Sequence, residues 1–298
     1  MSTMATTLEF STLGVIGPGR MGSALAESLS LRGYPIHAIA GRSEACPKAR
    51  ALAQRVHTRA MSVQSLADTC SLIFIATPDD AIAPLADTTE WSAGSAVVHL
   101  SGATDVQALQ AAQHCQAHIG GFHPLQSISQ PVGTATTFQH CTITIEAEHE
   151  ALSNDLATLA HALGSHVNIL PPNTRMRYHA AANHASALLI ALMTDMARLW
   201  ESWGSSEKDM MDALLPLMQN TLSAAHERGV TQALTGPLAR GDVGTLEGHL
   251  AALEQLDPAL ARRYAVRHQP LLTQAPDDQR QRIAALIDAY AAVNTQTS

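Results

Sequence analysis

The sequence predicts an α/β fold in which a parallel β-sheet layered with helices is followed by an all-α domain. Three observations lead to this prediction. A short apolar run near the start of the chain ends in a glycine-rich turn, apolar runs then alternate with amphipathic segments, and after residue 170 only helical periodicity remains. The chain has 298 residues, which is enough for two domains. We therefore expect an N-terminal domain over residues 10–170 and a helical domain over residues 171–298.

The glycine-rich turn has the spacing G-x-G-x-x-G and lies between an apolar run and an alanine-rich amphipathic segment. The order strand, turn, helix is that of a Rossmann-type dinucleotide site, in which the glycines permit the turn, the approach of a pyrophosphate and close helix packing. Free N–H groups at the start of the helix would face the phosphates. The expected cofactor contacts in this turn are Gly17, Pro18, Gly19, Arg20, Met21 and Gly22. A glycine-rich turn without a ligand is the alternative.

The residues after the second expected strand indicate which dinucleotide binds. That strand covers residues 35–40 and is followed by Gly41, Arg42 and Ser43. A chain that prefers NAD usually has a carboxylate about 20 positions after the glycines. Here Arg42 can instead pair with a 2′-phosphate, and Ser43 can add a hydroxyl donor or cap a helix that starts near residue 44. We predict NADP as the cofactor; a solvated surface arginine is the alternative.

Further strands are expected where apolar runs end in small or polar residues. The runs at 72–76 and 96–100 are typical of parallel strands buried on both faces. Weaker signals predict strands near residue 56 and at 118–120, 142–145 and 166–169, with helices over 44–55 and 148–163. Because ligands bind beyond the carboxyl ends of parallel strands, we expect residues 77–79 beside the cofactor ribose, with Ala76, Thr77 and Pro78 as cofactor contacts. A proline that simply ends the strand is the alternative. Ser101 would lie nearer the nicotinamide, and residues 121–126 would face the substrate.

The second half of the chain follows Pro171 and Pro172 and is helical throughout. The expected helices cover residues 175–203, 207–228 with a kink at Pro216, 242–256, 258–270 and 277–293. The segment 178–194 carries no formal charge, which is typical of a buried helix. One chain offers few helices to cover it, so we expect a homodimer built through the helical domain.

Composition excludes several classes of function. The net charge of −8 and the lack of a basic run argue against a nucleic-acid partner. No apolar run is long enough to cross a membrane, and residues 1–9 do not resemble a secretion signal. The four cysteines are scattered, which is typical of reduced thiols and favours a cytoplasmic location. His114, His118 and His123 lie near Cys115, but no second cysteine pair completes a zinc site, so we predict no metal.

Reduction of a carbonyl needs a proton donor, and several side chains could supply one. The chain has only two lysines, and neither is well placed for the reacting centre. His179 and Asn183 share one face of the expected long helix, where His179 could act as acid and Asn183 could orient the oxygen. His123 is a second candidate acid, Ser101 would line the same space, and Arg240 could bind a substrate carboxylate. A buried histidine within the helices and a surface connector around Arg240 are the structural alternatives.

These motifs also occur together in a known family. The ordered set is GPGRMG at 17–22, GRS at 41–43, ATPD at 76–79, SGA at 101–103, FHPLQ at 122–126, YHAAA at 178–182 and TGPLARGD at 235–242. It resembles the Rossmann-like oxidoreductases that carry a C-terminal helical domain of unknown function. These are relatives of deazaflavin-dependent NADP oxidoreductases, in one superfamily with pyrroline-5-carboxylate reductase and ketopantoate reductase. The resemblance covers residues 10–295 and implies a nicotinamide cofactor and a dimer.

The sequence departs from the resembled proteins at two points. The lysine of ketopantoate reductase has no counterpart, which weakens a direct transfer of that mechanism. The family pattern often has asparagine near position 187, where this chain has Ala187, and Asn183 could compensate from one turn earlier. We therefore expect an NADPH-dependent reductase of a small oxo- or imino-carboxylate, similar to ketopantoate or a pyrroline carboxylate. A non-catalytic NADP sensor and a deazaflavin:NADP oxidoreductase are the alternatives.

Overall fold

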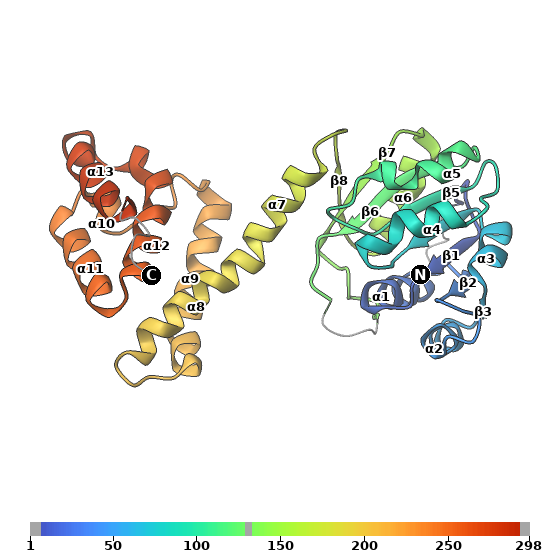
Figure 1. Ribbon diagram of the computed structural model, residues 1–298, viewed down its shortest axis with the longest axis horizontal. Helices are drawn as coiled ribbons and strands as arrows, with labels where there is room; N and C mark the ends of the chain where they lie inside the picture. Colours follow the sequence, from blue (N-terminus) through green and yellow to red (C-terminus); the bar gives the residue numbers. More distant parts are fainter. Residues whose placement is uncertain (1–6, 129–132, 293–298) are drawn as a thin grey trace. The chain divides into compact units, whose positions relative to one another are not determined.

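The computed structural model describes residues 7–128 and 133–292 (Figure 1). Contacts along the chain divide it into two units, Met1–Ala185 and Ser186–Ser298. The first unit therefore includes residues 171–185, which were expected in the second domain. Within the described residues, no helix combines the length and the apolar character that a membrane span requires.

The first unit is built on one eight-stranded sheet with the order β3-β2-β1-β4-β5-β6-β7-β8. The strands are β1 (Leu13–Ile16), β2 (Ile36–Ala40), β3 (Arg59–Met61), β4 (Leu72–Ile75), β5 (Ala96–His99), β6 (His118–Pro124), β7 (Thr142–Ala147) and β8 (His166–Ile169). The strands β1, β4 and β5 are buried along their whole length, as their continuous apolar sequences predict. The strand order reverses between β1 and β4, and ligands of open α/β sheets bind beside such a switch point.

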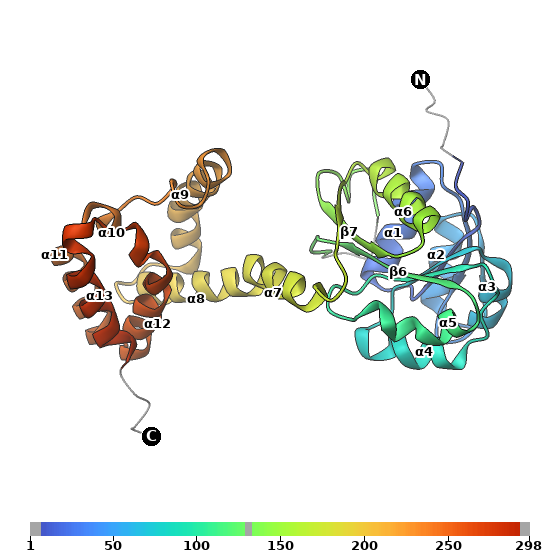
Figure 2. The ribbon, with the colours of Figure 1, turned by 90° about the horizontal axis from the view of Figure 1, so that it is seen from above.

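Helices cover both faces of this sheet (Figure 2). The helices α1 (Arg20–Leu31), α2 (Pro47–Arg55) and α6 (Glu150–Ala162) pack on one face, and α3 (Val63–Thr69), α4 (Ile82–Thr88) and α5 (Gln110–His114) pack on the other. Two short 3₁₀ helices, η1 (Asp79–Ala81) and η2 (Val106–Leu109), follow β4 and β5. The predicted layering of helices on a sheet is thus confirmed.

The sheet differs from the predicted all-parallel arrangement at one pair. Strands β6 and β7 are antiparallel, while all other neighbours are parallel. A parallel pair needs a crossover element, and the described part of the connection between β6 and β7 contains no α-helix, so the chain returns in the opposite direction. The strand β6 also continues to Pro124, which places His123 within the strand rather than beyond its end.

Two further predictions for this unit were wrong. The strand expected near Val56 is β3, at Arg59–Met61, and Val56 instead caps the end of α2. The helix expected from residue 44 begins at Pro47, whose fixed φ suits the first helical position, so Cys46 rather than Ser43 is the N-cap.

Helix α7 (Arg175–Ala185) ends the first unit, and the second unit begins with α8 (Ala187–Glu201). The sequence predicted one helix here, but the backbone of Ser186, with φ −120° and ψ −86°, interrupts it. The second unit continues with α9 (Glu207–Arg228), α10 (Pro237–Arg240), α11 (Val243–Leu256), α12 (Pro258–His268), η3 (Gln269–Gln274) and α13 (Asp277–Ala291). Asp242 caps α11 as predicted, because its carboxylate accepts the Thr245 N–H at 3.1 Å.

The single chain does not supply the cover expected for residues 178–194. Leu188 and Ile190 on α8 are 45% and 61% exposed, and Leu215 and Leu217 on α9 are exposed as well. Helix α8 packs on α9, and this neighbour leaves part of its apolar surface uncovered.

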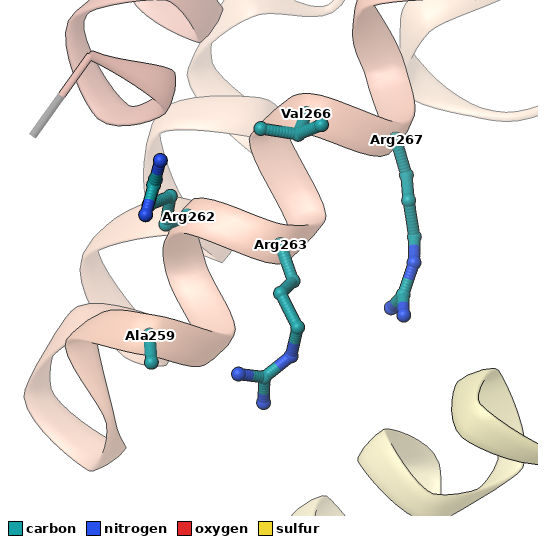
Figure 3. A pocket seen from close by; sticks show the side chains of 5 residues that line it. All are labelled: Ala259, Arg262, Arg263, Val266 and Arg267. Carbon is teal, nitrogen blue, oxygen red and sulfur yellow. The ribbon is translucent and has the colours of Figure 1, made fainter.

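An ion-pair cluster ties α8 to α12 within the second unit. The buried Asp195 of α8 accepts hydrogen bonds from Arg263 at 2.8 Å and from Arg267 at 2.6 Å. Figure 3 shows the shallow pocket on α12 in which these two guanidinium groups point toward α8. Since the carboxylate is buried and doubly paired, its hydrogen bonds lower the pKa of Asp195 although burial alone raises it.

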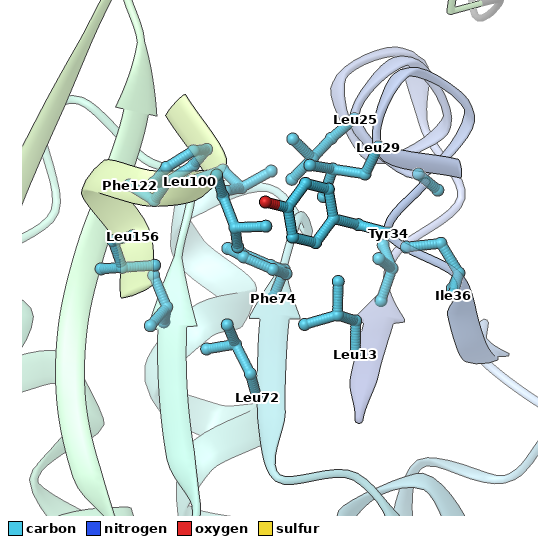
Figure 4. Packing of buried hydrophobic residues seen from close by; sticks show 14 of the residues in the cluster. Leu13, Leu25, Leu29, Tyr34, Ile36, Leu72, Phe74, Leu100, Phe122 and Leu156 are labelled. Atoms are coloured by element: carbon cyan, nitrogen blue, oxygen red, sulfur yellow. The ribbon is translucent and has the colours of Figure 1, made fainter. Parts of the chain in front are cut away.

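Each unit has its own hydrophobic core. The larger core lies between the sheet and the face covered by α1, α2 and α6, where Phe74 and Phe122 meet with their ring centroids 5.5 Å apart (Figure 4). A second cluster fills the opposite face, and the second unit is centred on Leu246, Leu250 and Ile283. The carboxyl edge of the sheet is thereby held on rigid strands.

Candidate functional site

The glycine-rich turn after β1 has the geometry of a dinucleotide cradle. Gly17 has φ +100°, and a Cβ there would lie 2.7 Å from the Ala76 carbonyl oxygen. A Cβ on Gly22 would lie 2.1 Å from the Gly17 carbonyl oxygen, so neither position accepts another residue without a backbone shift. A Cβ on Gly19 would meet nothing within 4 Å, and no side chain caps the start of α1. The turn therefore presents open space and uncapped N–H groups, which fits a pyrophosphate.

Hydrogen bonds bring the predicted cofactor segments together. The Gly17 N–H donates to the Ala40 carbonyl at 2.9 Å, and the Ala76 N–H donates to the Ile16 carbonyl at 2.7 Å. The turn 17–22, residues 41–43 after β2 and residues 76–78 after β4 are therefore neighbours at one edge of the sheet. Among the described residues the buried Thr77 hydroxyl has no hydrogen-bond partner, as expected of a group that awaits a ligand.

Arg42 and Ser43 are both exposed at the end of β2. Arg42 forms no ion pair with any described residue, and Ser43 is not engaged as a helix cap. Both side chains are thus available to a phosphate next to the cradle. A Cβ on Gly41 would lie 2.7 Å from the Cys46 Sγ, so this glycine is needed for the tight approach of the loop.

Two predicted histidines converge at Gly102, just beyond the end of β5. A Cβ on Gly102 would lie 2.6 Å from the Nδ1 of His179 and 2.8 Å from the Nε2 of His123. The rings of His123 and His179 form an edge contact with centroids 6.1 Å apart. The buried Nδ1 of His179 has no hydrogen-bond partner among the described residues. Two imidazole nitrogens thus meet at a residue without a side chain.

His123 also pairs with a side chain that sequence reasoning did not select. Its Nδ1 lies 2.7 Å from the hydroxyl oxygen of Tyr178 on α7. Burial, aided by His179 and Arg175, lowers the pKa of His123 to about 4, so its imidazole is neutral near pH 7. Burial raises the pKa of Tyr178, while a hydrogen bond with Thr144 and the charge of Arg175 act in the opposite direction.

A buried ion pair fixes the first turn of α7. The Nε of Arg175 donates to a Glu146 carboxylate oxygen at 2.7 Å, and its Nη1 donates to the Ser101 carbonyl at 2.8 Å. Arg175 is 2% exposed, and a Cβ on Gly121 would lie 2.3 Å from its Nη2. The arginine therefore links β5, β6, β7 and α7 beneath the two histidines. A charged residue at the start of a long uncharged segment was the available signal for this role.

The other predicted catalytic residues occupy different surroundings. The Ser101 hydroxyl accepts the N–H groups of Ala103 and Thr104, at 3.2 and 2.9 Å, and so shapes the turn after β5. Asn183 lies exposed on α7, one turn after His179. Arg240 ends the short helix α10 in the second unit and is exposed. Within the described chain, no three His, Cys, Asp or Glu side chains are grouped to hold a metal ion.

Two family comparisons cover most of the chain. Residues 6–124 match the family of Rossmann-like domains, and residues 141–269 match a domain of unknown function, DUF2520. The chain thus joins a Rossmann-like domain to a DUF2520 domain, in agreement with the resemblance identified from its motifs. Among curated proteins none matches the sequence.

Solved structures of similar fold cover nearly the whole chain. A candidate NADP oxidoreductase from Bacteroides fragilis is 25% identical with a TM-score of 0.67, over 89% of this chain and 99% of that chain. A reductive aminase from Aspergillus terreus, in complex with NADPH and ethyl-5-oxohexanoate, is 18% identical with a TM-score of 0.62, over 94% and 93%. Pyrroline carboxylate reductase from Plasmodium falciparum, with NADP bound, is 13% identical with a TM-score of 0.58, over 95% and 97%. The chain has the fold of these oxidoreductases.

Proposed function

We propose that this chain, which joins a Rossmann-like domain to a DUF2520 domain, is an NADPH-dependent reductase of a small oxo- or imino-carboxylate. The observation that carries the proposal is the convergence of His123 and His179 at Gly102. This cluster shares the carboxyl edge of the sheet with the glycine cradle, and Asp79, which follows β4, is close enough to influence the pKa of His123. Hydrogen-bonding side chains of β6 and α7 thus lie at the same edge of the sheet as the cradle, which supports reduction of a carbonyl there.

The cofactor would be held by residues already described. The N–H groups at the start of α1, around Gly19 and Arg20, face the pyrophosphate, Thr77 and Pro78 lie beside the ribose, and Arg42 with Ser43 binds the 2′-phosphate. When bound, the reduced nicotinamide supplies the hydride. The chain itself positions the substrate, excludes water and delivers the proton.

The substrate is expected to be a small carboxylate that resembles ketopantoate or a pyrroline carboxylate. In this proposal His123 and His179 contact the reacting heteroatom, Ser101 shapes the adjoining turn and Asn183 orients the substrate. Arg240, exposed at the end of α10, is the proposed partner of the substrate carboxylate through paired hydrogen bonds. The exposed apolar side chains of α8 and α9 support a homodimer formed through the helical domain. The four unpaired cysteines support a cytoplasmic location.

Cofactor binding and turnover test the proposal separately. Titration calorimetry is expected to detect NADPH binding, and R42A should weaken it about 10- to 100-fold, the loss of one charge-assisted contact. The R59A variant, altered at an exposed arginine of β3, is the matched control and should bind like the wild type. NADPH oxidation with a panel of oxo- and imino-carboxylates then identifies the substrate. Tight NADPH binding without turnover of any substrate would favour a non-catalytic NADP sensor. Turnover of a deazaflavin alone would favour a deazaflavin:NADP oxidoreductase.

A further inference from the structure

A chain of polar side chains from four elements runs beneath the candidate site. The Asn168 side-chain amide on β8 donates to the Thr144 hydroxyl oxygen on β7 at 3.1 Å. The Tyr178 hydroxyl on α7 lies 2.7 Å from the Nδ1 of His123 on β6, and Thr144 is close enough to lower the pKa of that hydroxyl. The other nitrogen of His123, Nε2, faces Gly102 in the site. Polar side chains of β8, β7, α7 and β6 thus lead toward the turn at Gly102.

The acidity of the phenol sets the direction of the hydrogen bond between Tyr178 and His123. A phenol O–H is a stronger acid than the N–H of a neutral imidazole, so Tyr178 donates its hydrogen to the Nδ1 of His123 across the 2.7 Å contact. A neutral imidazole that accepts at Nδ1 carries its hydrogen on Nε2.

We infer that His123 is held as the Nε2–H tautomer, donates this hydrogen to the substrate heteroatom and regains a proton at Nδ1 from Tyr178. The inference rests on the proposed function and names the proton path at the same site. Nothing in the sequence motif distinguishes Tyr178 from an ordinary helix residue; the hydrogen bond to His123 does.

The step balances in atoms and charge. The substrate carbon receives the hydride of the reduced nicotinamide, and the π electrons of the C=O bond move to oxygen. That oxygen takes the hydrogen of His123 Nε2, while the hydrogen of the Tyr178 hydroxyl passes to His123 Nδ1. The products are an alcohol, a neutral His123 with its hydrogen on Nδ1 and a tyrosinate, which water reprotonates. Burial raises the pKa of Tyr178, which favours reprotonation of the tyrosinate, while Thr144 and Arg175 partly offset this rise.

This path also narrows the substrate class. An imine that arrives already protonated needs no donor, whereas a neutral oxo group must receive a proton as the hydride arrives. A neutral imidazole that is hydrogen-bonded to a phenol can supply the proton that a neutral oxo group requires. The inferred substrate is therefore an oxo-carboxylate.

Nitrogen-15 NMR of the labelled histidines tests the tautomer without any substrate or cofactor. Wild-type protein at neutral pH is expected to show a neutral His123, assigned through H123N, with its hydrogen on Nε2 and a hydrogen-bonded Nδ1. A hydrogen on Nδ1 would overturn the inference. Because this readout does not depend on turnover, it stands even if the proposed reductase activity is absent.

Kinetics test the role of Tyr178 once a substrate is known. The Y178F variant is expected to lower kcat about 10²-fold or more with little change in KM, and T144V should lower it less. A solvent isotope effect on kcat should change in both variants. The matched control is Y264F, because Tyr264 forms the same kind of pair, 2.9 Å from His249 Nδ1 in the second unit. An unchanged kcat in folded Y178F, checked by thermal unfolding, would refute the path through Tyr178.

Discussion

Gly102 shows how one missing side chain can set up a site. Its absent Cβ is the space in which His123 and His179 meet, and the atoms that a Cβ would contact are ring atoms at the ends of side chains. These side chains can shift at a low cost in stability, but a shifted imidazole no longer points at the reacting atom of the substrate. A side chain added at position 102 is therefore expected to affect catalysis more than stability.

We expect G102A to lower kcat about 10-fold or more while the melting temperature changes by only about 2 °C. Steady-state kinetics and thermal unfolding measure the two effects. The control is G248A on α11, where an added Cβ meets nothing within 4 Å. Full activity of G102A would show that the two rings need not meet at this position.

Arg175 and Glu146 illustrate a buried pair whose removal is costly. Both side chains are shielded from water, so either charge alone would be left unpaired in the interior. We expect R175M to lower the free energy of unfolding by about 3–5 kcal/mol, and R175M/E146L to recover most of this loss. Urea unfolding of the single and double variants measures both changes. A double variant as unstable as R175M would show that the hydrogen bond to the Ser101 carbonyl, not the ion pair, is responsible.

Stability should also depend on pH through the buried histidines. The pKa of His123 falls to about 4 and that of His99 to about 3, from 6.5 in the unfolded chain. Between these values the unfolded chain binds more protons, so stability rises with pH and is lost as pH falls from about 6.5 to about 4. The groups that face His123 are Arg175, Tyr178 and His179 of α7, Asp79 of η1 and His99 of β5.

Urea unfolding at several pH values checks this dependence. In H123N the slope between about pH 4 and 6.5 should decrease, because one of the two titrating imidazoles is gone. R175M should raise the pKa of His123 toward its ordinary value, since a nearby positive charge is removed. A wild-type free energy of unfolding that stays constant across this range would contradict the expected neutral state of both histidines.

At the scale of elements, features set by the local sequence were predicted, whereas features set by long-range contacts were not. The strands β1 and β4 were predicted because continuous apolar runs are sufficient to identify buried parallel strands. The cap of α11 was predicted from Asp242 and its position before a helical pattern. By contrast, the antiparallel return of β7 depends on how a long connection folds back. The break at Ser186 has no glycine or proline to announce it.

The residues of the candidate site were likewise predicted only in part. The glycine cradle follows from spacing within one turn, and the residues after β2 and β4 could be added because parallel strands end at a common edge. His123 was predicted from its place near the end of a strand, and His179 from its spacing with Asn183 on one helix face. Tyr178, Thr144 and Glu146 were missed as site residues, since their importance comes from contacts between strands and a helix far apart in sequence.

The N-terminal cap of α9 gives a test at this scale. Ser206 and Asp209 form a reciprocal capping box, in which the Ser206 hydroxyl accepts the Asp209 N–H and the Asp209 carboxylate accepts the Ser206 N–H. We expect S206A to lower the free energy of unfolding by about 1 kcal/mol. The neighbouring S205A variant should change it much less, and thermal unfolding compares the two. Equal losses would indicate that the cap is not the source of stability.

At the scale of the whole molecule, the helical unit presents apolar side chains that one chain leaves uncovered. Ile190 on α8 and Leu217 on α9 are 61% and 62% exposed. We expect analytical sedimentation at micromolar concentration to give the mass of a dimer, and I190D or L217D to give a monomer. L31D is the matched control, because Leu31 is equally exposed, at 62%, but lies in the first unit. A monomeric wild type would refute the proposed dimer.

The two borders of the sheet bear on association between sheet edges. Strand β3 has three residues and β8 has four, and among the described residues each has a neighbouring strand on one side only. Borders this short offer few backbone groups to an incoming peptide, so they are poor templates for β-augmentation or fibril growth. Such margins need less protection by a covering helix or loop than long edge strands would.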